Sequence, residues 1–316
     1  MTIAQERGIQ KEHIITGQGQ GTTYTLKYFS DKEINKKSID SILSVIDLSM
    51  SLYKDSSLIN RFNEGPDLYI DMDPHMKKVI KESFKIHKFS KGYFDITVFP
   101  LVSLWGFGPK GFSKVPNQNE VDSVKQFVGM DKLYVRRNRL YKTDPRVRID
   151  LNGIAQGYTV DCLAAYLSHE GVKNFLVELG GEIRTKGQKP NGNFQIMIDE
   201  KATDTAYSYP VLSVKNMAVT SSGVREKHYR LGDKIVSHHI DPRSGKPIES
   251  KTISVTVIAK TALLADAVDN YFMSLDVQEA IRIAEKTRDV DICLYYLDNK
   301  NTKVTYTSGF NNYIYK

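Results

Sequence analysis

Three polar side chains interrupt an apolar segment in the stretch ALLADAVDNYF, residues 262–272. Asp266 precedes Asp269 by three positions and Asn270 by four, a spacing that places all three on one face of a helix. Their neighbours are mostly apolar, so the two carboxylates are expected to be buried. Burial of a carboxylate is costly unless a partner compensates its charge. The sequence therefore predicts that this helix holds a partner.

A glycine-containing segment, RIDLNGIAQGYTVD (148–161), is expected to run from a strand through a turn into a helix. Asp150 ends the strand, and Gly153 and Gly157 bracket the turn. Glycines allow a ligand to approach the backbone closely, and a helix start attracts anions. The segment matches neither a Walker loop nor G-x-G-x-x-G. Taken alone, it fits a structural turn and a ligand-binding turn equally well.

Adjacent histidines, His238 and His239, lie in the segment SHHIDPRSGKPI (237–248). Neighbouring residues on a strand point to opposite faces, so only one histidine is expected to face a given site. The sequence has no G-x-S-x-G, which argues against a Ser-His-Asp hydrolase. A structural role is the simpler interpretation of either histidine taken alone.

The elements that must position these residues are helices and strands in mixed order, which predicts an α+β fold in one compact unit with one or two lobes. Helices are expected at 38–53, from Pro74 after an Asp73 cap, and at 155–169, 261–275 and 277–287. The aromatic segment 92–112 reads as a structured loop. Strands are expected at 22–29, 133–142, 146–150, 174–179, 193–199, 211–219, 252–259, 290–297 and 303–307.

The composition is that of an ordinary globular protein: of 316 residues, 41% are apolar and 26% charged. The net charge is 44 − 37 = +7, but the basic residues alternate with acids, and no nucleic-acid-binding signature occurs. The sequence contains no run of 18 apolar residues, so it predicts no membrane-spanning helix. Cys162 and Cys293 lie in apolar runs without metal-type spacing. The polar start lacks a signal-peptide core, which fits a cytosolic chain or one whose leader has been removed.

Eight segments, taken in order, resemble the ApbE-type flavin transferases, the FAD:protein FMN transferases. The resemblance covers residues 17 to about 300, so we assign 1–16 to a polar N-terminal segment and 17–316 to the transferase domain. The segments are QGTTY, SLYKDSSLINRFN, GYFDITVFPLVSLWGFG, DLNGIAQGYTVD, VELGGEIRTKG, VTSSG, HHIDPRSGKP and LADAVDN.

The resemblance implies a T-fold-type α+β architecture, FAD as substrate and a divalent cation, usually Mg²⁺. The family reaction cleaves the FAD diphosphate, attaches FMN to a Thr or Ser hydroxyl of a target protein and releases AMP. Targets are flavin-carrying subunits of redox pumps or exported electron carriers. A FAD pyrophosphatase and a non-catalytic FAD-binding protein are the alternatives. Relatives are commonly exported and often lipid-anchored, so the periplasm or cell envelope is expected, with the chain a lipoprotein whose leader was removed. The cytoplasm is the alternative.

The resemblance also implies roles for individual residues. The cation is expected on Asp266, Asp269, Asn270 and the carbonyl of Gly153, with Asn270 standing where relatives usually have Thr. His238 is expected to activate the acceptor hydroxyl or to orient phosphate, with the side chain of His239 pointing away from it. The expected FAD contacts are Gln20, which replaces a common Met, Tyr53, Tyr93, Phe94, Asp95, Asp150, Gln156 and His239.

Overall fold

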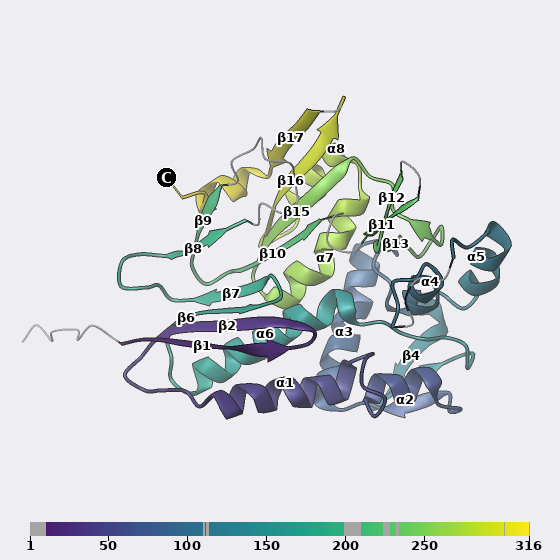
Figure 1. The fold of residues 1–316 in the computed structure, drawn as a ribbon, viewed down its shortest axis with the longest axis horizontal. Helices are drawn as coiled ribbons and strands as arrows, with labels where there is room; N and C mark the ends of the chain where they lie inside the picture. Colours follow the sequence, from purple (N-terminus) through teal and green to yellow (C-terminus); the bar gives the residue numbers. More distant parts are fainter. Residues whose placement is uncertain are drawn as a thin grey trace, which may run out of the picture.

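An eight-stranded sheet, antiparallel at every pairing among the described residues, forms the centre of the molecule (Figure 1). This computed structural model describes residues 11–109, 111, 114–198, 210–223, 228–231, 234–299 and 301–315. In spatial order the strands are β1 (Glu12–Gly19), β2 (Thr22–Phe29), β6 (Asn174–Leu179), β7 (Glu182–Lys186), β10 (Ala218–Gly223), β15 (Thr252–Ala259), β16 (Val290–Asp298) and β17 (Asn301–Tyr306).

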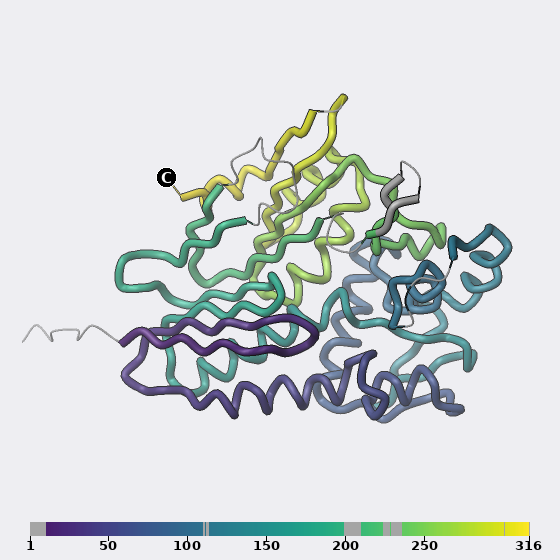
Figure 2. Tube along the Cα trace, viewed as in Figure 1, coloured from purple at the N-terminus to yellow at the C-terminus, as the bar shows by residue number. Residues whose placement is uncertain are grey.

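The N-terminal hairpin of β1 and β2 lies beside strands from the middle of the chain (Figure 2). Our domain boundary at residue 17 falls within β1, because residues 12–19 pair continuously with β2. Residues 1–10 lie outside the described part of the chain. Residues 12–16 therefore belong to β1, which forms one edge of the main sheet.

Helices cover one face of the sheet, and the alternation of side chains along each strand divides the apolar residues between its two faces. On β15, Val255 and Val257 join the large core beneath the helices, whereas Ile258 joins a smaller cluster on the opposite face. The helices are α1 (Lys36–Met50), α2 (Leu58–Glu64), α3 (Pro74–Phe89), α4 (Phe99–Leu104), α5 (Gln118–Lys125), α6 (Asn152–His169), α7 (Ala262–Ser274) and α8 (Val277–Ala284), with 3-10 turns η1 (Ile96–Val98), η2 (Met130–Lys132) and η4 (Ser308–Tyr313).

Smaller sheets surround this central layer. A third apolar cluster joins Leu101 on α4 to the strands around the histidine segment, and Trp105 Nε1 donates a 2.9 Å hydrogen bond to the carbonyl of Gly245. This cluster therefore anchors the segment that carries His238 and His239. The small sheets are β3 (Tyr69–Asp71) with β5 (Arg139–Lys142) and β4 (Leu133–Arg136), β8 (Phe194–Met197) with β9 (Val211–Val214), β11 (His228–Leu231) with β12 (Lys234–Ser237), and β13 (Ile240–Asp241) with β14 (Lys246–Pro247).

The α+β class and the main helices are confirmed, including the Asp73 cap, whose carboxylate accepts a hydrogen bond from the Met76 amide. The strands expected at 133–142 and 211–219 are each divided in two, into β4 and β5 and into β9 and β10. Two further expectations are wrong. The loop expected at 92–112 contains η1 and α4. Residues 146–150 form no strand, because the side chain of Asn63, not a neighbouring strand, pairs with both backbone groups of Ile149 at 2.8 Å. Among the described residues, no helix is long and apolar enough to cross a membrane.

Candidate active site

Helices α6 and α7 pack so closely that only glycine fits at the contact. A Cβ added at Gly157 would lie 2.3 Å from the carbonyl oxygen of Ala262 and 2.7 Å from the Cβ of Asp266. The amide of Gly157 donates a 2.8 Å hydrogen bond to Asp266 Oδ2. The glycine turn and the acidic helix, about a hundred residues apart in sequence, therefore form one site.

Two side chains fix the start of α7. The carboxylate of Asp161, on α6, accepts hydrogen bonds from the amides of Ala262 at 3.1 Å and Leu263 at 3.0 Å, and the Thr261 hydroxyl accepts one from Leu264. Burial raises the pKa of Asp161, although these two hydrogen bonds oppose the shift. Asp161 is not among the residues predicted for the site, because nothing in its local sequence shows that its partners lie on another helix.

The acidic residues of α7 are buried, as their apolar neighbours predict: Asp266 is 5% exposed and Asp269 is 2% exposed. Asp269 Oδ2 accepts a 2.6 Å hydrogen bond from the hydroxyl of Ser222 on β10, and Asp269 Oδ1 accepts one from the amide of Asn270. Gly157, Ser222 and Asn270 are neutral donors to the two carboxylates. Carboxylate oxygens are ligands that suit a hard cation.

Gly153 and Asn270 lie next to each other. Gly153 departs from helical geometry in the first turn of α6, at φ −83° and ψ 22°. A Cβ added there would lie 3.5 Å from Asn270 Nδ2 and 4.0 Å from the ring of Phe94. Asn270 Oδ1 is buried and has no hydrogen-bond partner among the described residues.

These residues fit a hard divalent cation, because the set offers carboxylate, amide and carbonyl oxygens, including one buried oxygen without a partner. In the part of the chain that the structure describes, no three His, Cys, Asp or Glu side chains gather as a metal centre. The predicted set does not require such a cluster, since only Asp266 and Asp269 supply charged ligands.

The two histidine rings lie together, so the expectation that His239 points away from His238 is wrong. Their ring centroids are 3.9 Å apart. Strand alternation does not apply here, because β12 ends at Ser237 and β13 begins at Ile240. His238 is half-buried and meets the ring of Phe107 edge-on, with centroids 6.3 Å apart.

His239 is 5% exposed, and the side chain of Asn270 and the backbone of Gly223 lie against it. Burial first, and the neighbouring His238 second, hold the pKa of His239 well below its usual range. Neither ring nitrogen forms a hydrogen bond of normal geometry within the described residues. His239 is therefore a neutral imidazole beside the predicted cation site.

An aromatic region lies at the start of α6. Tyr53 is 64% exposed, and partial burial of its hydroxyl together with the charge of Asp150 raises its pKa. Asp150 Oδ1 accepts a 2.7 Å hydrogen bond from the amide of Asn152, the first residue of α6. Phe94 lies against Gly153. The structure thus gathers three of the predicted FAD contacts around this end of the helix.

Tyr93 and Asp95 are already engaged within the chain. The guanidinium of Arg243 lies 3.2 Å from the centroid of the Tyr93 ring, so that the ring face is covered. Asp95 Oδ1 accepts hydrogen bonds from the amide and hydroxyl of Thr97, and Asp95 Oδ2 accepts one from Met130. Burial raises the pKa of Asp95. Asp95 therefore organises its turn, and its contact with FAD stays a prediction.

Gln20 and Gln156 lie near α6 and the β6–β7 connection. Gln20 Nε2 donates a 3.0 Å hydrogen bond to Thr159 Oγ1 on α6, while Gln20 Oε1 is buried without a partner among the described residues. A Cβ added at Gly180 would lie 3.1 Å from Gln156 Nε2. The two glutamines thus contact different neighbours from Tyr53 and Phe94.

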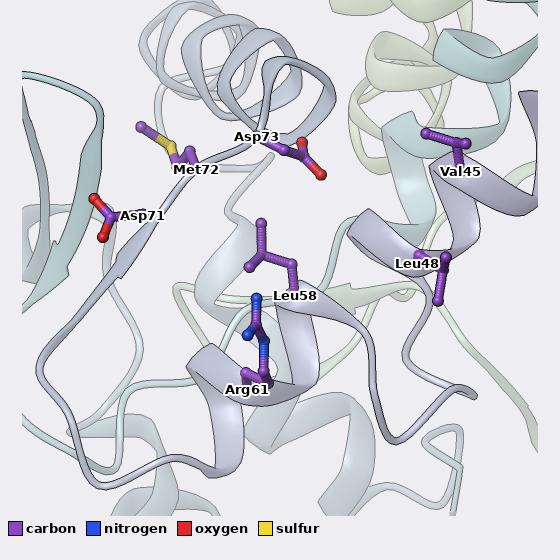
Figure 3. A pocket seen from close by; sticks show the side chains of 7 residues that line it. All are labelled: Val45, Leu48, Leu58, Arg61, Asp71, Met72 and Asp73. Carbon is purple, nitrogen blue, oxygen red and sulfur yellow. The ribbon is translucent and has the colours of Figure 1, made fainter.

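A surface cavity of about 410 Å³ lies between α1, α2 and the start of α3 and contains none of the predicted site residues (Figure 3). The carboxylate of Asp73 in its wall already accepts hydrogen bonds from Ser49 and Met76. We therefore place the active site at the α6–α7 contact and not in this cavity. The cavity is lined by Val45, Leu48, Leu58, Arg61, Asp71, Met72 and Asp73.

Comparison with known proteins gives matches along most of the chain. Residues 20–294 match the model of the ApbE family. The chain is 34% identical to an FAD:protein FMN transferase of Haemophilus influenzae, over 90% of this chain and 87% of the relative. It is 32% identical to one of Vibrio cholerae, over 89% and 86%. Among solved structures, it is similar to the apo form of the Pseudomonas stutzeri flavinyl transferase ApbE, with a TM-score of 0.88, 30% identity and coverage of 96% and 97%.

Proposed function

The chain belongs to the ApbE family, and from this we propose that it is an Mg²⁺-dependent FAD:protein FMN transferase. It would attach FMN through a phosphoester to a Thr or Ser hydroxyl of a target protein and release AMP. The observation that carries the proposal is the contact of α6 with α7, where Gly153 lies beside Asn270 and the Gly157 amide donates to Asp266.

Asp266, Asp269, the Asn270 amide oxygen and the Gly153 carbonyl would hold the cation. When bound, the cation neutralises charge on the FAD diphosphate. The protein's own contribution is to fix the position of the two buried carboxylates, with donors from Gly157 and Ser222. Asp266 and Asp269 are the two acidic residues of α7, so replacement of one leaves only the other on this helix.

His238 is proposed to take the proton from the acceptor hydroxyl. The acceptor oxygen bonds to the phosphorus of the FMN half, and the bond from that phosphorus to the bridging oxygen breaks. AMP leaves with the bridging oxygen. The position of His238 supports this role, because the ring is half-buried, is anchored against Phe107, and adjoins His239 beside Asn270.

The aromatic and glutamine ends of the site are proposed to bind the two halves of FAD. Tyr53 and Phe94 present ring surface suited to a planar ligand. Gln20 and Gln156 offer amide groups near the β6–β7 connection. A dinucleotide that spans both ends would bring its diphosphate to the centre, beside Gly153.

The acceptor is proposed to be a flavin-carrying subunit of a redox pump or an exported electron carrier, and the setting to be the periplasm or cell envelope. Both proposals come from the family resemblance. Fractionation of cells that express the full-length gene product checks the setting. Recovery of the protein only in the cytosolic fraction would contradict it.

The direct test incubates the protein with FAD, Mg²⁺ and an acceptor that carries an Asp/Ser/Gly-x-x-Ser/Thr-Thr motif. A covalent mass increment of FMN on the acceptor, with AMP released in equal amount, is expected. An acceptor with its reactive Thr replaced by Ala is the control. AMP release without attachment would indicate a FAD pyrophosphatase, and FAD binding without either product would indicate a binding protein.

A further inference from the structure

Two buried polar side chains next to each other lack hydrogen-bond partners among the described residues. They are Asn270, through Oδ1, and His239, through both ring nitrogens. The Asn270 side chain and the Gly223 backbone lie against the His239 ring and act to raise its pKa, against the larger effect of burial, yet neither contact has the geometry of a normal hydrogen bond. Each buried group without a partner costs about 1–3 kcal/mol, so two neighbouring ones require an explanation.

The orientation of the Asn270 amide explains why these two groups lack partners. As placed, its nitrogen is the atom directed at Gly153, 3.5 Å from where a Cβ would stand. An amide nitrogen is a donor and cannot bind a cation, whereas its oxygen can. Amide oxygen and nitrogen have nearly the same shape, so their assignment rests on the hydrogen bonds that they form. A half-turn of the amide exchanges the two atoms without moving the helix.

After this half-turn, Asn270 Oδ1 and one ring nitrogen of His239 gain a role, while the Gly223 backbone remains beside the ring. Oδ1 comes to the side of Gly153, and Nδ2 turns toward His239. A neutral imidazole has one acceptor nitrogen, which can receive the amide N–H. The groups that influence His239 are His238, Asn270 and the Gly223 backbone, and none of these competes as an acidic partner.

We propose that His239 is a positioning residue that accepts a hydrogen bond from Asn270 Nδ2 and thereby holds Asn270 Oδ1 toward the cation site beside Gly153. This inference rests on the proposed function for the presence of a cation. The positioning role of His239 also explains why an amide at position 270 needs a neighbouring hydrogen-bond acceptor. A Thr hydroxyl can rotate to present its oxygen unaided, but an amide can present the wrong atom.

Cation affinity tests the proposal without relying on activity. Mn²⁺ serves as the probe, because its binding is measured directly by electron paramagnetic resonance, and titration calorimetry with Mg²⁺ repeats the measurement. His239→Leu should weaken Mn²⁺ binding about tenfold, the lower end of the effect of losing a group that orients a metal ligand. His169→Leu, which removes an exposed histidine at the far end of α6, should leave the affinity unchanged.

A double-mutant cycle separates positioning from a general structural effect. In the Asn270→Thr background, His239→Leu should cause no further loss of Mn²⁺ affinity. Equal weakening in both backgrounds, or no weakening in either, would overturn the proposal. His239→Gln retains an acceptor of similar reach and should bind Mn²⁺ like the unmodified protein, which provides the test if His239→Leu does not fold.

The outcomes also distinguish this proposal from the proposed function. If the unmodified protein binds no Mn²⁺ and transfers no FMN, the proposed function fails. If it binds and transfers normally, and His239→Leu does the same, only the positioning role fails.

Discussion

The backbone amide of Gly157 donates a 2.8 Å hydrogen bond to Asp266 Oδ2 and joins α6 to α7 at the centre of the site. This contact requires glycine, because the Ala262 carbonyl occupies the space of a side chain. One residue thus determines both the spacing of the helices and the position of a carboxylate. Gly157 and Asp266, the two sides of this contact, can each be tested by substitution.

Gly157→Ala should destabilise the protein by about 1–3 kcal/mol, since the new methyl group would lie 2.3 Å from the Ala262 carbonyl oxygen and the helices must separate. Urea unfolding followed by circular dichroism measures the loss. Gly153→Ala is the matched control, because its Cβ would meet its nearest neighbour at an ordinary 3.5 Å. Equal stability of the two variants would show that the α6–α7 contact relaxes freely.

Asp266→Ala and Asp266→Asn should both abolish FMN transfer. Each removes a charged ligand of the proposed cation, so the charge of the FAD diphosphate is no longer compensated. Asp266→Asn can still accept the Gly157 hydrogen bond, so its unfolding midpoint should stay near that of the unmodified protein. Covalent FMN on the acceptor is measured by mass spectrometry. Asp122→Ala, at an exposed position of α5, is the control that keeps full transfer. Normal transfer in Asp266→Asn would refute the assigned ligand.

Asn270→Thr should retain or improve FMN transfer, because a hydroxyl oxygen replaces the amide oxygen and removes a buried group without a partner. Initial rates at several Mg²⁺ concentrations measure the effect, and a lower Mg²⁺ requirement is expected. Asn270→Leu, which has similar volume and no ligand atom, should lose transfer. If Asn270→Thr lost transfer instead, the assignment of this helix position would be wrong.

Arg243→Ala should destabilise the turn that follows the histidines by roughly 1 kcal/mol. Arg243 pairs with Asp241 through two hydrogen bonds, at 3.0 and 3.1 Å, and covers the ring of Tyr93. Burial raises the pKa of Asp241, but the Arg243 hydrogen bonds and charge outweigh burial and hold the pKa below 3.8. The stability from this ion pair is therefore fully present above pH 3.8 and is lost as the pH falls through the lowered folded-state pKa.

The measurement is the difference in free energy of unfolding between the unmodified protein and Arg243→Ala, from pH 6 down to pH 2.5. The difference should be constant at the upper end and shrink below pH 3.8, without reaching zero, because the contact with Tyr93 does not depend on Asp241. Arg282→Ala, which removes an exposed ion pair on α8, is the reference for the change in free energy of unfolding on loss of a surface ion pair. A difference that grows toward low pH would contradict the role assigned to the ion pair.

Local patterns predicted much of the fold. Alternation predicted β2, where Tyr24, Leu26 and Tyr28 are fully buried, and the Asp73 cap with Pro74 predicted the start of α3. These predictions succeed because the responsible interactions lie within a few residues of one another. The strand expected at 146–150 fails for the opposite reason, since Asn63, more than eighty residues away, takes the place of a neighbouring strand.

The sequence by itself determined that Asp266, Asp269 and Asn270 share a helix face, because the helical period depends only on local spacing. It could not determine what lies opposite them. The tertiary structure decided that Gly157 and Ser222 donate to the carboxylates, that Asp161 caps α7, and that His239 faces Asn270. Buried polar groups must find partners, and the partner of each is fixed by packing between distant segments, which no local pattern records.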